Sequence, residues 1–177
     1  MRKTKNEELE RLSIGEYKKA SKLPVVIVLD NVRSTHNVGS VFRTADAFRI
    51  ERIILCGITA TPPQRDIYKT ALGATESVDW VYRESTADAV GELKGEGYRV
   101  IAVEQADESI CLEDFMPDPS GRLALIFGHE VAGVQEEVMA LVDGCIEIPQ
   151  AGTKHSLNIS VTAGIVLWEI YGKLSKK

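Results

Sequence analysis

The sequence has no apolar run long enough to cross a membrane. Its longest runs, Pro24–Leu29 and Leu123–Phe127, are far shorter than the ~20 residues of a membrane helix. The N-terminal stretch MRKTKNEELERL has no apolar segment after its basic residues, unlike a secretory signal. The three cysteines, Cys56, Cys111 and Cys145, are isolated and odd in number, and for the two in strand-like stretches a buried reduced thiol is favoured. We therefore expect a cytoplasmic protein with no membrane partner.

Several common site motifs are also missing. No G-x-G-x-x-G follows the first strand-like run, which argues against a Rossmann dinucleotide site, and no P-loop signature is present. His129 and Glu130 are adjacent, but the second histidine of a zinc protease motif is absent. The remaining histidines, His36 and His155, lie in other loops without metal-ligand spacing, so the sequence predicts no metal site.

The net charge of −5 argues against nucleic acid as a partner, because phosphate binding requires a basic surface. The charge is unevenly distributed, however. Residues 1–22 hold seven basic and four acidic side chains, a net charge of +3 that leaves −8 for the rest. We expect residues 1–22 to be a basic, helical extension that contacts RNA, or else a solvated helix of mixed charge. Residues 23–177 would form one compact domain.

The rest of the chain alternates strand-like and helical stretches. Residues 37–47 place apolar side chains at helical spacing, and Ser85 with Asp88 resembles a capping box for a helix that ends near Gly95 or Gly97. The strand-like runs are Pro24–Asp30, Arg52–Cys56, Val78–Tyr82, Arg99–Val103, Leu123–Phe127 and Cys145–Ile148. This alternation predicts an α/β fold with a mostly parallel sheet and flanking helices. In such sheets, ligands bind beyond the carboxyl ends of the strands.

The last predicted helix, Leu157–Tyr171, is apolar on nearly every side. Its apolar residues form two stripes, one of Leu157, Val161, Ile165 and Trp168 and one of Ile159, Ala163, Val166 and Ile170. One stripe can face the sheet. The other needs further structure of the same chain or a partner subunit, and we favour a homodimer.

Three polar loops that contain glycine follow predicted strands, at residues 31–48, 128–134 and 150–160. Glycine lets the backbone approach a small molecule closely. Ordinary strand-to-helix turns use the same residue types. Three such loops at one edge of a sheet nevertheless favour a binding site.

Together, these loops resemble the three motifs of the SpoU (TrmH-like) family of SPOUT RNA methyltransferases. The motifs are HNVGSVFRTAD with Asn37 and Arg43, the G-x-E-x-x-G of Gly128, Glu130 and Gly133, and IPQAGTKHSLNISV at residues 148–161. The similarity extends from about residue 24 to residue 168.

The resemblance implies a C-terminal trefoil knot, a homodimer that buries the last helix, and S-adenosylmethionine bound within the knot. The implied reaction is methylation of a ribose 2′-OH in tRNA or rRNA, and the compact chain favours tRNA. The adenine would be held mainly by backbone groups around Ile148 and Leu157. The implied cofactor residues are Gly128, Glu130, Ile148, Gln150, Ser156 and Leu157.

The resemblance gives Arg43 the leading catalytic role. A guanidinium is hardly ever deprotonated, so we expect it to hold a phosphate and stabilise the developing alkoxide rather than act as a base. Asn37 would orient Arg43 or the ribose, or else cap a helix. Ser156 and Asn158 would bind substrate phosphate or the partner's loop, with helix capping as the alternative for Asn158. Glu130 would contact the cofactor or fix its loop by accepting backbone N–H bonds.

Other interpretations stay open. His36 and His155 are candidate bases, since imidazole suits proton transfer near neutral pH. A SPOUT enzyme that methylates an RNA base is disfavoured by Ser156 and Asn158. A non-catalytic RNA-binding or cofactor-binding protein is disfavoured by the presence of Arg43 and the whole third motif.

Overall fold

The computed structural model describes residues 1–175 and is built on a seven-stranded sheet in the order β3-β2-β1-β6-β4-β7-β5. The strands are β1 Leu23–Asp30, β2 Ile50–Cys56, β3 Asp79–Arg83, β4 Tyr98–Val103, β5 Ile110–Cys111, β6 Arg122–Phe127 and β7 Gly144–Glu147. Every pairing in this sheet is parallel, so all the carboxyl ends lie at one edge. The predicted α/β fold with a parallel sheet is confirmed.

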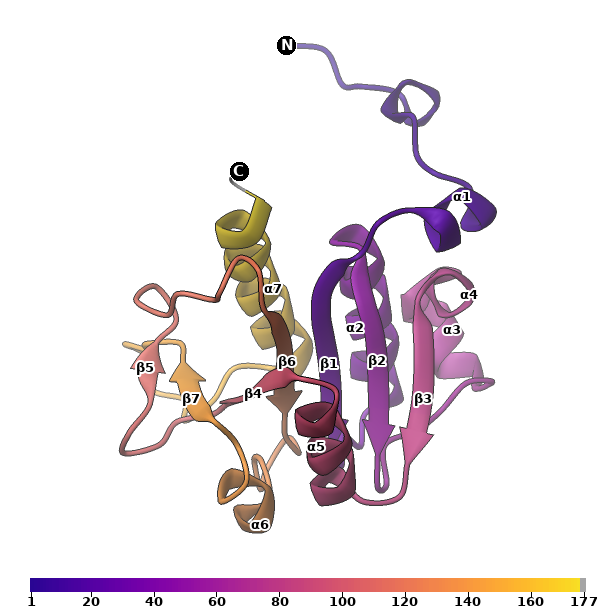
Figure 1. Cartoon of the computed structure of the whole chain (residues 1–177). Coiled ribbons are helices and arrows are strands. Elements are labelled where there is room, and N and C mark those ends of the chain that lie inside the picture. The colour runs from indigo at the N-terminus through magenta and orange to yellow at the C-terminus, as the bar shows by residue number, and fades with distance from the viewer. Residues whose placement is uncertain (176–177) are drawn as a thin grey trace.

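Helices cover both faces of the sheet. They are α1 Ile14–Lys19, α2 Thr35–Ala47, α3 Arg65–Ala71, α4 Ala74–Ser77, α5 Thr86–Gly95, α6 Glu136–Met139 and α7 Ile159–Ser175, after a 3-10 turn at Asn6–Leu9. Figure 1 shows α2, α3 and α7 behind the sheet and α5 in front of it. Alternate residues of β1 pack into the two layers, with Ile27 on the α2 side and Val28 on the α5 side. Burial on both faces explains why the strands are continuous apolar runs.

The predicted elements match the structure closely, with exceptions at short segments. The six predicted strands are present, and α5 begins as expected, with the Ser85 side chain accepting a bond from the Asp88 N–H. The sequence did not predict β5, which has two residues and depends on its pairing with β7. It also did not predict α3, α4 or α6, which are too short to show a clear helical period.

The N-terminal extension is attached to the domain near its end. Ser13 and Glu16 form a capping box at the start of α1. Tyr17 is only 5% exposed and packs into the core layer that contains α2 and α7. Lys22 lies 3.3 Å from the centre of the Tyr17 ring, a cation–π contact. The second half of the extension therefore contacts the domain directly.

Helix α7 buries one of its two apolar stripes. Ile159, Ala163, Val166 and Ile170 are buried, with Leu167, in the core layer shared with α2. On the opposite stripe Val161, Ile165 and Trp168 are exposed, Trp168 by 65%. Leu157, the predicted start of this stripe, is also exposed but precedes the helix, which begins at Ile159 because Asn158 caps it. One side of the helix therefore faces the core, as predicted, and the other stays largely exposed within residues 1–175, where the Trp168 ring contacts the ring of Phe48.

The three cysteines are free thiols within the described chain, and Cys56 and Cys145 are buried. Burial raises the pKa of the Cys56 thiol to about 12, so it stays protonated at neutral pH. The prediction of buried reduced thiols is confirmed for these two.

No helix among residues 1–175 is both long and apolar enough to span a bilayer.

Candidate cofactor and substrate site

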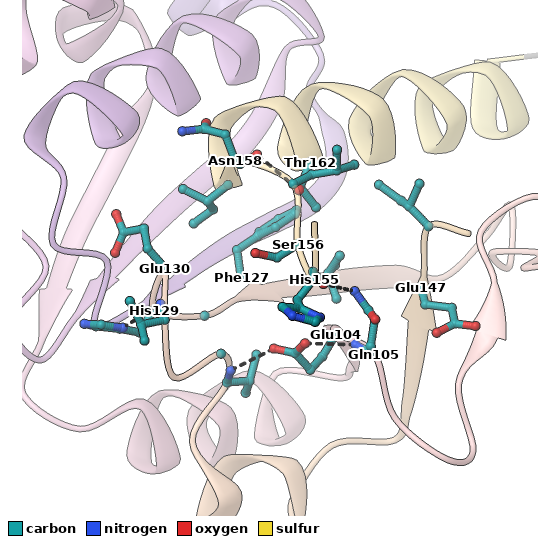
Figure 2. Close-up of a pocket in the computed structure, with 18 of the residues that line it drawn as sticks. Glu104, Gln105, Phe127, His129, Glu130, Glu147, His155, Ser156, Asn158 and Thr162 are labelled. Atoms are coloured by element: carbon teal, nitrogen blue, oxygen red, sulfur yellow. Dashed lines mark hydrogen bonds between the residues drawn. The ribbon is translucent and has the colours of Figure 1, made fainter. Parts of the chain in front are cut away.

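A cavity of about 640 Å³ lies at the carboxyl edge of the sheet. The segments that follow β4, β6 and β7 and the start of α7 form its walls (Figure 2). The structure brings all six predicted cofactor residues to this cavity, together with Asn158: Gly128, Glu130, Ile148, Gln150, Ser156 and Leu157. The second and third motifs thus line the same cavity.

The G-x-E-x-x-G segment forms a tight loop that requires its glycines. A Cβ on Gly128 would lie 2.1 Å from the carbonyl carbon of Gly133, so no other residue fits without moving the backbone. Gly133 has a φ of +70°, which favours glycine. His129 and Gly133 exchange two backbone hydrogen bonds, of 2.9 and 2.8 Å. The Nδ1 atom of His129 also accepts a bond from the Val131 N–H, at 3.0 Å. These bonds hold the loop in shape beside the cavity.

Glu130 joins the first and second motifs. Its carboxylate accepts hydrogen bonds from the backbone N–H groups of Arg33 at 3.1 Å and Ser34 at 3.0 Å. It also accepts a bond from the Asn37 side chain at 3.2 Å. Asn37 in turn accepts a bond from the Asn158 side chain at 3.2 Å, which brings in the third motif. Asn37 therefore connects Glu130 with the start of α7.

The Glu130 carboxyl has a lowered pKa. Burial raises the pKa, but N–H donors from its own backbone, Arg33, Ser34 and Asn37 together lower it below the ordinary value. The group is therefore an anion at neutral pH. Of the two roles expected for Glu130, the structure shows the fixing of loops through backbone N–H bonds.

The two asparagines have different local roles. Asn158 caps α7, because its Oδ1 accepts bonds from the Ser160 N–H at 2.9 Å and the Ser160 hydroxyl at 2.7 Å. The capping alternative for Asn37 is wrong, because Ser34 caps α2 and the Asn37 N–H donates to the Ser34 hydroxyl. The Asn37 side chain is therefore available to the site.

Arg43 lies outside this group. It is six residues after Asn37 on α2, or roughly 9 Å along the helix axis. Its side chain is exposed, does not line the cavity and makes no hydrogen bond or ion pair with residues 1–175. The expectation that Asn37 orients Arg43 is not met, since the Asn37 side chain bonds to Glu130 and Asn158. His155 lines the cavity, whereas His36 is exposed on α2.

The sequence did not predict one wall of the cavity, the segment after β4. The Glu104 carboxylate accepts a bond from the Val134 N–H at 3.1 Å, and the Gln105 amide donates to the carbonyl oxygen of His155 at 2.8 Å. A usable signal was present, because a Glu-Gln pair directly follows a predicted strand. Among residues 1–175, no cluster of His, Cys, Asp or Glu side chains could hold a metal ion.

These features define an α/β protein with a small-molecule site at the carboxyl edge of a parallel sheet. Residues 24–168 match the SpoU rRNA Methylase family along most of the chain. The chain belongs to this family.

Individual relatives are consistent with this assignment. The chain is 33% identical over 151 residues to a Staphylococcus haemolyticus protein named for the TrmH family of tRNA/rRNA methyltransferases, covering 85% of this chain and 59% of the relative. The AdoMet-bound rRNA methyltransferase from Sinorhizobium meliloti has a TM-score of 0.80 at 28% identity, over 89% and 60% of the two chains. A structure described as explaining 2-OH methylation of C/U34 on tRNA has a TM-score of 0.77 at 27% identity, over 88% and 100%. The chain spans 59% and 63% of the length of two curated Staphylococcus relatives that it matches, less than two thirds of each.

Proposed function

We propose that this protein transfers a methyl group from S-adenosylmethionine to a ribose 2′-OH of tRNA or rRNA. The observation that carries this proposal is the single cavity shared by the second and third motifs and joined to the first motif through Glu130 and Asn37. The S. meliloti structure contains AdoMet, and the tRNA-related structure concerns 2-OH methylation. The latter structure concerns a tRNA, which supports tRNA as a candidate substrate.

The cavity is chemically suited to the cofactor. Its size falls within the usual range of small-molecule sites. Its lining includes three carboxylates, of Glu104, Glu130 and Glu147, but no lysine or arginine from the described chain. A polyphosphate would meet like charges there, whereas a sulfonium cation would not. We assign cofactor binding to the six motif residues named above, with the adenine against backbone groups near Ile148 and Leu157.

When bound, the cofactor supplies an electrophilic methyl group, and the protein must place the ribose oxygen about 3 Å from it. We assign substrate placement to Asn37, Ser156 and Asn158, because Asn37 and Asn158 are hydrogen-bonded together beside the cavity and Ser156 lines it. Arg43 lies away from the cavity, which suits a residue that binds the RNA phosphate rather than the cofactor. By holding the phosphate next to the target ribose, its guanidinium would help to keep the attacking oxygen in place.

We also propose that the C-terminal part of the chain is knotted. The connection from β4 to β6 passes through β5, and β7 inserts between β4 and β5. After β7, the chain returns across the sheet to place α7 in the core layer shared with α2. Such a crossing supports a trefoil knot, which is rare in proteins.

The exposed stripe of α7 supports a homodimer in the working enzyme. Surface patches of this kind usually mark protein contacts, and a twofold axis would pair the stripe with its copy. We place the protein in the cytoplasm, which its free thiols support.

Calorimetry tests the cofactor assignment. We expect the purified protein to bind S-adenosylmethionine or S-adenosylhomocysteine and to bind neither NAD nor ATP, because the cavity wall offers carboxylates and no basic side chain from the described chain. The titrations should be repeated with RNA present. Failure of both adenosyl ligands to bind under either condition would exclude the proposed cofactor.

We further propose that residues 1–22 contribute to RNA binding. Deleting the whole segment would remove the buried Tyr17, so substitution is the better test. Changing the exposed Lys3, Lys5, Lys18 and Lys19 to glutamine should weaken RNA binding and lower its log–log salt slope by about one unit for each phosphate that is no longer neutralised. Cofactor affinity is the control and should not change. An unchanged slope would show that the segment is only a solvated extension.

A further inference from the structure

Glu104 is a half-buried carboxylate whose place in the cavity is fixed by the backbone around it. It directly follows β4, which lies between β6 and β7 in the sheet. Its Oε2 atom accepts the Val134 N–H at 3.1 Å, and its Oε1 atom accepts the Gln105 N–H at 2.9 Å. The Gly133 backbone packs against it, since a Cβ on Gly133 would lie 2.2 Å from Oε2. The carboxylate therefore cannot move freely within the cavity wall.

These bonds leave acceptor capacity on both oxygens. A carboxylate offers about four acceptor positions, and the two backbone N–H groups occupy one on each oxygen. The side chain lines the cavity (Figure 2). Two adjacent acceptors held in a fixed position match two adjacent hydroxyl donors. A ribose carries such a pair, and acidic side chains near strand ends bind ribose hydroxyls in other nucleotide sites.

We propose that Glu104 recognises the ribose of the adenosyl cofactor by accepting hydrogen bonds from its 2′- and 3′-hydroxyls. This inference rests on the proposed function, because it requires an adenosyl ligand in the cavity. Glu104 then has two tasks: it holds the Gly128–Val134 loop through Val134 and it selects a ligand with an intact ribose diol. A residue that only anchored the loop would not distinguish ligands that differ in one hydroxyl.

Glu147 provides a matched control. It lines the same cavity and carries the same charge, but in Figure 2 its carboxylate is turned away from Glu104 and His155. Replacing Glu147 by glutamine removes one negative charge without touching the proposed diol contact. General electrostatic effects on ligand affinity should be similar in Glu104→Gln and Glu147→Gln.

The test is calorimetric titration of wild type, Glu104→Gln, Glu104→Ala and Glu147→Gln with S-adenosylhomocysteine and its 2′-deoxy and 3′-deoxy analogues. We expect the wild type to bind each deoxy analogue at least about tenfold more weakly than the parent ligand, since each analogue lacks one hydrogen bond to a charged acceptor. This ratio should fall toward one in both Glu104 variants and stay at the wild-type value in Glu147→Gln. Thermal melting of each variant checks that it is folded.

Two outcomes would overturn the assignment specifically. Wild-type protein that binds the parent and deoxy ligands equally would exclude a diol contact without recourse to any variant. If the Glu104 variants bind all three ligands more weakly by the same factor, Glu104 only anchors the loop through Val134. Wild-type protein that binds none of the three ligands would instead overturn the proposed cofactor, and the diol contact with it.

Discussion

Replacing Arg43 by alanine should slow methyl transfer to RNA by about a hundredfold or more, because loss of its phosphate contact would misplace the ribose oxygen and a shift of about 1 Å can cost that much. Cofactor affinity should stay near the wild-type value, because Arg43 does not line the cavity. A residue that positions the ribose of the RNA affects turnover rather than binding of the cofactor. Single-turnover transfer with saturating cofactor would measure this effect, and calorimetry with S-adenosylhomocysteine would serve as the control.

Arg43→Lys and His36→Ala separate the possible roles of the guanidinium. Arg43→Lys should also transfer the methyl group slowly, since an ammonium group cannot make the bidentate hydrogen bonds to phosphate that a guanidinium makes. If Arg43 were a true base, the wild-type rate would keep rising well above neutral pH. If His36 were the base, the rate would level off once the imidazole is neutral, and His36→Ala would be the more damaging change. Near-wild-type rates in both arginine variants would contradict the proposed role.

A charged residue in the exposed stripe of α7 should convert the protein to a monomer. Trp168→Glu and Ile165→Glu would each place an unpaired charge in the proposed interface, which typically costs about 3–5 kcal/mol. Both side chains lie at the surface of the single chain, so folding of the protomer should tolerate the change. Light scattering at micromolar concentration should show a wild-type dimer and monomeric variants.

Leu72→Glu is a matched control for the dimer experiment. Leu72 is 65% exposed, as Trp168 is, but it follows α3 and does not belong to α7. Its substitution should leave the dimer intact. A monomeric wild type would rule out the proposed interface, and loss of the dimer in Leu72→Glu as well would point to a general effect of charge.

The sequence predicted the sheet well because each central strand is an uninterrupted apolar run buried on both faces. The run at β1, for example, is buried from Val25 to Asp30. Short elements were harder to predict. The two residues of β5 gain their strand conformation from pairing with β7, and this pairing depends on the tertiary fold.

The sequence predicted which loops form the site, but it did not predict the hydrogen bonds that join their side chains. The glycines and Glu130 could be found from motif spacing. The hydrogen bonds from Asn37 to Glu130 and from Asn158 to Asn37 join residues 93 and 121 positions apart, so no local pattern reveals them. Glu104 was missed because its segment has no glycine motif. The distance of Arg43 from the cavity also depends on how α2 packs against the sheet.

The most direct test of the central proposal uses S-adenosylmethionine labelled in its methyl group, incubated with the protein and with tRNA or rRNA from cells that lack it. The RNA is then digested to nucleosides and analysed by mass spectrometry. We expect the label in a 2′-O-methylnucleoside, with little transfer by Arg43→Ala. Label found only in a base-methylated nucleoside, or no transfer to either RNA, would contradict a ribose 2′-O-methyltransferase.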